Sequence, residues 1–136
     1  MIERASLPWP IAGPFRITQT ARDHTSRKPP SKNALDLGAR EGTPVLAVMD
    51  GVVLAAGWSD AGGWHVRLGH AQHGAQTYYA HMRLLAVAGG AGPVQVRAGE
   101  LIGWVGSTGN STGPHLHFEL WLDGKDVDPA PWMQAR

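Results

Sequence analysis

The chain has 136 residues, enough for one domain around a single hydrophobic core. Its 12 Lys and Arg residues nearly balance its 11 Asp and Glu residues, so it has no basic field to attract nucleic acid or an anionic membrane. With seven His and no Cys, any metal site must use imidazole and carboxylate ligands, and the fold owes nothing to disulfides.

Neither the start of the chain nor its hydropathy gives a membrane signal. No stretch approaches the roughly 18 consecutive apolar residues of a membrane span. The first residues, MIERAS, lack the apolar core of a signal peptide. We therefore expect no membrane insertion and no export signal in this chain.

Short apolar runs separated by Gly and Pro predict many short strands. Residues 45–56 hold two such runs around Asp50-Gly51, which predicts two strands joined by a hairpin or a tight bend. Residues 65–68 and 77–81 predict a second hairpin. The one segment that allows a short helix, residues 82–88, is ended at once by two glycines.

The second half of the chain continues this pattern. Residues 94–96 and 101–105 read as strands, and a loop rich in Gly, Ser and Thr follows over residues 106–113. Residues 115–121 alternate strictly and predict the last strand, which Asp123-Gly124 ends in a turn. There is no internal repeat. We predict an all-β protein, a single domain over residues 1–136 with a core from about 10 to 130, built on an antiparallel sheet.

Two histidines share one face of the predicted last strand. Residues two apart in a strand project to the same side, so His115 and His117 point together while Leu116 and Phe118 point to the opposite, apolar side. One such ring can bind a metal while its neighbour handles a proton. Alone, the pattern favours a pair of surface histidines on an edge strand.

Longer blocks of sequence make the pattern more specific. The run from Gly106 to Glu119, GSTGNSTGPHLHFE, closely resembles the signature of the lysostaphin-type zinc endopeptidases, a family of peptidoglycan hydrolases. ALDL around Asp36, the EGTPV segment at 41–45, the DGVV segment at 50–53 and YAH at 79–81 look like further blocks of the same family. They occur in order and span nearly the whole chain.

The resemblance implies an antiparallel sheet with a substrate groove and one Zn²⁺ ion. It implies that Asp36 and His117 are metal ligands and that His81 and His115 are the catalytic histidines beside a metal-activated water. A catalytic zinc site typically has three protein ligands and a fourth position for water, which agrees with that division. The sequence leaves open which histidine takes which catalytic role.

The third metal ligand departs from the commonest family pattern. That pattern is His-x-x-x-Asp, but the residue four before Asp36 is Lys32, whose ammonium group cannot replace an imidazole. Staphylolysin-like members supply this His from further upstream, and His24 is placed for that. We therefore predict a metal site of His24, Asp36 and His117; the alternative is that His24 is an ordinary exposed residue and the site is degenerate.

Other candidates lie around these residues. Tyr79, two before His81, is expected to share its face and line the groove, with a packing role as the alternative. Asn110 and Thr112 are predicted to bind substrate backbone, or only to form the turn. Glu119 fits a partner that orients an imidazole, or a charge on the groove wall. Three further histidines are expected at the solvated rim: His65, His70 and His73.

The resemblance implies a zinc-dependent endopeptidase that hydrolyses peptide cross-links or stem peptides of bacterial peptidoglycan. We expect a monomer acting on the cell wall, periplasmic or extracellular, either as a phage endolysin released by a holin or as a processed domain of an exported enzyme. Two rival functions stay open: an inactive peptidoglycan-binding or amidase-activating domain, and a phosphocarrier domain with paired histidines. The bond that is cut is not evident from the residues.

Overall fold

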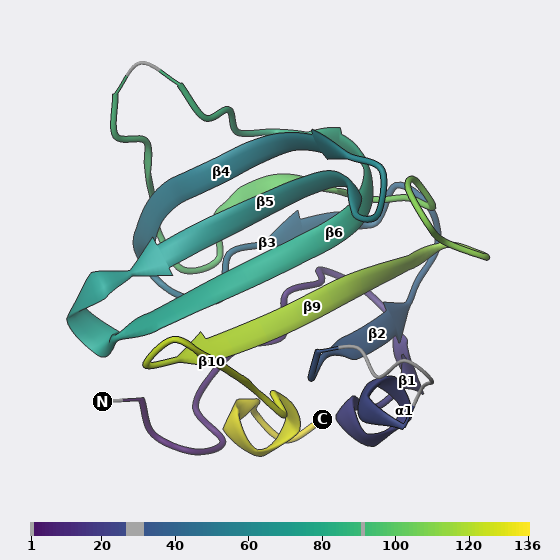
Figure 1. The fold of residues 1–136 in the computed structure, drawn as a ribbon, viewed down its shortest axis with the longest axis horizontal. Coiled ribbons are helices and arrows are strands. Elements are labelled where there is room, and N and C mark those ends of the chain that lie inside the picture. The colour runs from purple at the N-terminus through teal and green to yellow at the C-terminus, as the bar shows by residue number, and fades with distance from the viewer. Residues whose placement is uncertain (1, 27–31, 91) are drawn as a thin grey trace.

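The computed structural model describes residues 2–26, 32–90 and 92–136, which form a 10-stranded sheet with one short α-helix (Figure 1). Two single turns of 3₁₀ helix, η1 (Ala71–His73) and η2 (Ala130–Trp132), complete the regular structure of these residues, and α1 is Ala21–Thr25. The strands are β1 (Arg16–Gln19), β2 (Leu35–Gly38), β3 (Pro44–Leu46), β4 (Gly51–Ser59), β5 (Gly63–His70), β6 (Ala75–Leu85), β7 (Gln95–Val96), β8 (Leu101–Val105), β9 (His115–Leu122) and β10 (Lys125–Val127).

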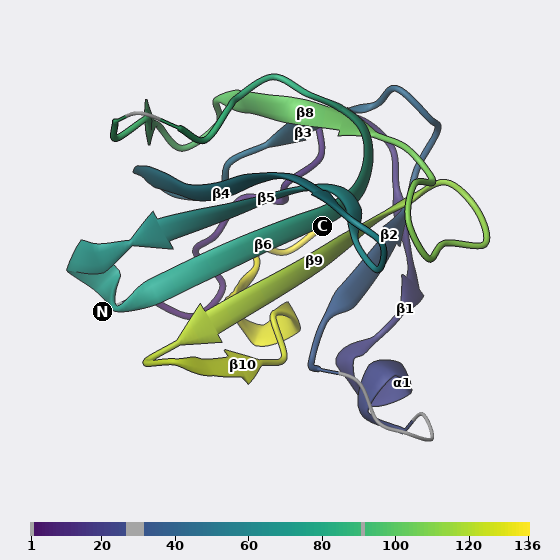
Figure 2. The same ribbon diagram turned by 45° about the horizontal axis from the view of Figure 1, so that its top comes forward.

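All pairings between the strands are antiparallel. The main path runs β1-β2-β9-β6-β5-β4-β7, and β10 pairs with β9. The pair β3 and β8 is attached through β8 to the end of β6 and lies beside the main strands, as Figure 2 shows. The prediction of an all-β fold on an antiparallel sheet is therefore confirmed.

The core lies on one face of this sheet. Alternate residues of β2 and β9 point into it, among them Leu35, Leu37, Leu116 and Phe118, none of them more than 1% exposed. Residues of β3, β5 and β8 pack into the same cluster, which buries apolar side chains from most of the strands. The polar residues between them, such as Asp36, must then project from the other face.

Three local predictions can be compared with these strands. Residues 65–68 and 77–81 do form a hairpin, β5 and β6. The region around Asp50-Gly51 is a bend and not a hairpin, because β3 pairs with β8 while β4 pairs with β5 and β7. The prediction that residues 82–88 could form a short helix was wrong, because β6 continues to Leu85 and pairs there with β8.

The end of the chain adds one more strand than expected. The alternating segment 115–121 falls within β9, but it is not the last strand, because the turn at Asp123-Gly124 leads into β10. Among the described residues, no helix has the length and apolarity needed to cross a membrane.

Candidate active site

The pairing of β2 with β9 brings two polar side chains together. Asp36 lies directly opposite His117 in the register, and the neighbours of both residues along the strands are core residues. The carboxylate and the imidazole therefore project from the same face, and His117 Nδ1 lies 3.1 Å from Asp36 Oδ1. Residues 81 positions apart in the chain meet here because of strand pairing alone.

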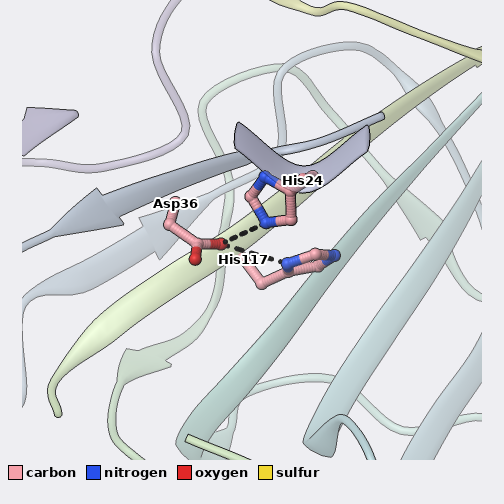
Figure 3. Close-up of side chains that lie close together, drawn as sticks. All are labelled: His24, Asp36 and His117. Atoms are coloured by element: carbon pink, nitrogen blue, oxygen red, sulfur yellow. Dashed lines mark hydrogen bonds and ion pairs between the residues drawn. The ribbon is translucent and has the colours of Figure 1, made fainter. Parts of the chain in front are cut away.

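Helix α1 adds His24 to this pair (Figure 3). The helix begins with a capping box, in which Thr20 and Asp23 each bond the backbone of the other. His24 Nδ1 donates to the Thr20 carbonyl at 2.9 Å, which directs Nε2 towards Asp36 Oδ1 at 3.2 Å. The alternative that His24 is an exposed loop residue is wrong, because its side chain is almost completely buried.

His24, Asp36 and His117 fit a metal ion. Each offers one ligand atom, and these three atoms lie within 4.8 Å of one another. Two imidazoles and a carboxylate are a donor set suited to zinc. His117 Nε2 contacts Glu119 Oε2 at 2.8 Å, an arrangement in which the carboxylate orients a metal-binding imidazole.

The charges within this cluster reinforce one another. Burial opposes ionisation of Asp36, but hydrogen bonds from His117 and His24 outweigh it and hold the Asp36 pKa well below its usual range. Burial likewise disfavours the charged form of His117, yet its bonds to Asp36 and Glu119 raise its pKa to about 9. In the metal-free protein, His117 is therefore protonated at neutral pH.

Metal binding should consequently displace a proton. A metal ligand must be an unprotonated imidazole, so Zn²⁺ added at pH 7 should release about one proton from His117. The number should decline as the pH rises through about 9, the His117 pKa in the metal-free protein. Calorimetric titrations in buffers of different ionisation enthalpy measure this number. Binding at pH 7 with no proton released would contradict the assignment of His117 as a ligand.

Two further histidines flank the cluster. His81 Nδ1 donates to the Thr108 carbonyl at 2.7 Å and His115 Nδ1 to the Gly113 carbonyl at 2.8 Å. Because a carbonyl oxygen only accepts, both protons are on Nδ1 in the neutral rings, and each Nε2 is left as an acceptor. The two ring centroids are 4.9 Å apart, and His115 Nε2 lies 3.7 Å from Asp36 Oδ2.

Burial gives His81 a different protonation state from that of His117. Desolvation lowers its pKa, and this effect outweighs the hydrogen bond to the Thr108 carbonyl. His81 is therefore neutral at neutral pH, the form that can accept a proton from water.

All of these side chains open into one cleft with a volume of about 490 Å³. It contains eight of the residues predicted from the sequence, with Asn110, Thr112 and Glu119 among them, and also Lys32. Its lining comprises Gln19, His24, Lys32, Asp36, Ala61, Gly62, Tyr78, Ala80, His81, Asn110, Ser111, Thr112, His115, His117 and Glu119.

Tyr79 does not line the cleft, so its predicted position was wrong. It is fully buried in the core, where its hydroxyl donates to Thr77 Oγ1 at 2.8 Å and accepts from the Val48 backbone at 3.2 Å. The alternation between residues 79 and 81 breaks because His81 has a φ of 65°, with its N–H bonded to the Gly62 carbonyl. Tyr78 lines the cleft instead. Because neighbouring residues of a strand project to opposite faces, the alternation of Thr77 and Tyr78 could have identified Tyr78 as the residue that faces the cleft.

The substitution Tyr79→Phe separates the two roles considered for Tyr79. It leaves the Val48 N–H without its acceptor and should lower the free energy of unfolding by about 1–2 kcal/mol. Activity of the folded variant should stay within about twofold of wild type, since the hydroxyl does not reach the cleft. Urea unfolding and peptide hydrolysis measure the two effects. A large loss of activity at unchanged stability would show that Tyr79 contacts substrate.

His70 also differs from expectation. It was placed at the solvated rim, but its ring is buried between the Asp50 carbonyl, 2.7 Å from Nδ1, and Thr77 Oγ1, 2.8 Å from Nε2. Its bonds join β5 to β6 and to the bend before β4, so it has a structural position.

With this geometry established, the chain can be compared with known proteins. Residues 30–129 match the model of peptidase family M23, and the chain belongs to this family of metallopeptidases. This agrees with the lysostaphin-type resemblance of the sequence. Over 119 residues it is 42% identical to the DD-carboxypeptidase/endopeptidase Mpg of Neisseria meningitidis, covering 88% of this chain and 26% of that protein.

Two other relatives are informative. The murein hydrolase activator EnvC of Escherichia coli is 35% identical over 127 residues, covering 92% of this chain and 28% of the relative. The catalytic domain of lysostaphin from Staphylococcus simulans aligns with a TM-score of 0.65 and 36% identity, over 72% of this chain and 75% of that one. The chain spans about a quarter of the length of the two curated relatives.

Proposed function

We propose that this chain is a zinc-dependent endopeptidase that cuts the peptide part of bacterial peptidoglycan. The observation that carries the proposal is the complete set of His24, Asp36 and His117 within 4.8 Å, with His81 and His115 beside it in the same cleft. Membership of family M23 supports the peptidase reaction, and the names of two relatives, an endopeptidase and a murein hydrolase activator, support the substrate.

His24, Asp36 and His117 would hold one zinc ion. Zinc bound there supplies Lewis-acid chemistry, since it polarises a peptide carbonyl and lowers the pKa of water to about 7. His24 takes the place of the His that family members often have four residues before Asp36. Lys32, which stands at that position, lies over the ring of Trp121.

The two remaining histidines would move protons and stabilise charge. We assign the role of proton acceptor to His81, because burial keeps its ring neutral and Nδ1 is already bonded to the Thr108 carbonyl. His115 is held by the Gly113 carbonyl and, in its protonated form, would donate from Nε2 to the charge that develops on the scissile carbonyl oxygen. Asn110 and Thr112 line the cleft and would contact the substrate backbone.

The same observations lead to a proposal for where the enzyme acts and in what form. The enzyme would act as a monomer on cross-links or stem peptides, in the periplasm or outside the cell, and a phage endolysin is one origin that fits. The zinc metallopeptidase catalytic domain would lie within residues 1–136. The phosphocarrier alternative is not favoured, because the histidines surround a carboxylate that would repel a phosphoryl group.

One experiment tests the enzyme proposal against an inactive domain. Metal content by elemental analysis and the clearing of peptidoglycan suspensions are measured for wild type, His24→Ala and the control His73→Ala, whose side chain is outside the cleft. Wild type and the control should carry about one zinc and clear the suspension, whereas His24→Ala should do neither. A metal-free, inert wild type would instead identify a wall-binding or activating domain.

A further inference from the structure

Two cations meet on a shared aromatic surface beside the cleft, which Lys32 and Tyr78 themselves line. Lys32 Nζ lies 5.4 Å and the Arg67 guanidinium carbon 5.5 Å from the ring centroid of Trp121. Arg67 also lies over the ring of Tyr78, at 4.8 Å. Such contacts hold a cation in place without neutralising it. We call these residues, Lys32, Arg67, Tyr78 and Trp121, the cationic platform.

The platform is connected to the candidate metal ligands. Trp121 Nε1 donates to Glu119 Oε1 at 2.8 Å, while the other carboxylate oxygen, Glu119 Oε2, contacts His117 at 2.8 Å. Each oxygen of the Glu119 carboxylate therefore already has a partner, the Trp121 N–H for one and the His117 ring for the other. The orientation of the Trp121 ring is fixed relative to His117.

The cations of the platform form no close ion pair among the described residues, although the charge of Arg67 adds to the bonds from His117 and Trp121 that outweigh burial and lower the Glu119 pKa. Within 2–26, 32–90 and 92–136, no ion pair involves Lys32 or Arg67; the Arg67 guanidinium donates only to the Gln76 side chain, at 3.3 Å. A half-buried Arg beside an exposed Lys, neither of them in an ion pair, is a surface suited to a carboxylate.

The strand register sets the distance from the metal cluster. Arg67, Tyr78 and Glu119 lie in one row across β5, β6 and β9, and Ala80, His117 and Asp36 form the next row on that face. Rows two residues apart along a strand are separated by about 7 Å. An extended peptide advances about 3.3 Å per residue, so Arg67 and Tyr78 lie about two residues from a bond cut at the metal.

We infer that the cationic platform binds a carboxylate of the substrate peptide, about two residues from the cleaved bond. The inference rests on the proposed function and refines its substrate class. The preferred substrate is an anionic stem or cross-link peptide with a free side-chain or C-terminal carboxylate, in contrast to an uncharged glycine bridge. Lys32, which departs from the commonest family pattern, then contributes to specificity.

The test compares two synthetic cross-linked stem peptides that differ only in whether their carboxylates are free or amidated. Dissociation constants are measured by calorimetry on zinc-loaded His81→Ala protein, which is expected to bind without cutting. The free carboxylate form should bind about tenfold more tightly, as expected for a charge-assisted contact at a partly exposed site. Adding Lys32→Gln and Arg67→Gln should bring the ratio of the two constants close to one.

The matched control removes two cations that are not part of the platform, with Arg16→Gln and Lys125→Gln, and should keep the tenfold ratio. Lys32 is exposed, so Lys32→Gln alone still tests the inference, by a reduced ratio, if Arg67→Gln unfolds the protein. A ratio near one in the His81→Ala parent, or one that survives the double substitution, overturns the inference. Because binding is measured without turnover, a failure to hydrolyse either peptide would count against the proposed function only.

Discussion

Asp36→Ala should abolish metal binding and hydrolysis together. The carboxylate is the common centre of the site, with His24, His117 and His115 within 3.2, 3.1 and 3.7 Å of its oxygens. Without it, two imidazoles remain, which is too few ligands for a catalytic zinc site. We expect less than about a tenth of an equivalent of zinc and a loss in kcat/KM on the order of 10³-fold or more, because water activation is lost.

The control for this variant is Glu41→Ala. Glu41 is a half-exposed carboxylate that pairs with Arg83 and lies outside the cleft, so zinc content and activity should match wild type. Circular dichroism would establish that Asp36→Ala is folded. An Asp36→Ala protein that keeps its zinc and full activity would refute the assigned metal site.

His81→Ala and His115→Ala should have the opposite signature, with zinc retained and rate lost. Neither residue belongs to the three-residue metal cluster, yet both present Nε2 to the cleft. Loss of general acid–base catalysis typically costs about 10²–10⁴-fold, so kcat should fall by that order at an unchanged zinc content. His73→Ala, the control from outside the cleft, should keep both.

The pH profile separates His81 from His115. Since burial lowers the His81 pKa below its usual value, the residue is neutral and competent above that pKa and loses function as the pH falls through it. Wild type should therefore lose kcat/KM on the acid side, and His81→Ala should lack that limb while His115→Ala keeps it. If both variants keep the limb, His81 is not the proton acceptor.

Much of the fold and site was predictable because the relevant patterns are local. Alternation over residues 115–121 follows from the geometry of a strand, and it placed His115 and His117 on one face and Leu116 and Phe118 in the core. The all-β class followed from short apolar runs between Gly and Pro. The family blocks around Asp36, His81 and His115 gave further candidates, which the structure brings into one cleft with the exception of Tyr79.

Long-range packing decided the rest. His24 reaches Asp36 only because α1 docks beside β2 and β9, and no periodicity in the chain encodes that contact. β3 pairs with the distant strand β8, and β4 pairs with β5. The residues around Asp50 encode neither pairing, so the sequence could not distinguish a hairpin from a bend there.

The sequence by itself determined the strand pattern, the absence of a disulfide and the chemistry available to a metal. Only the tertiary structure decided that Tyr78 and not Tyr79 faces the cleft, because a positive φ at His81 interrupts the alternation on which the prediction relied. It also decided that Lys32 and Arg67, 35 positions apart, meet on Trp121. Side-chain periodicity is a local property of backbone geometry, whereas bulges and contacts between distant residues depend on how the whole core packs.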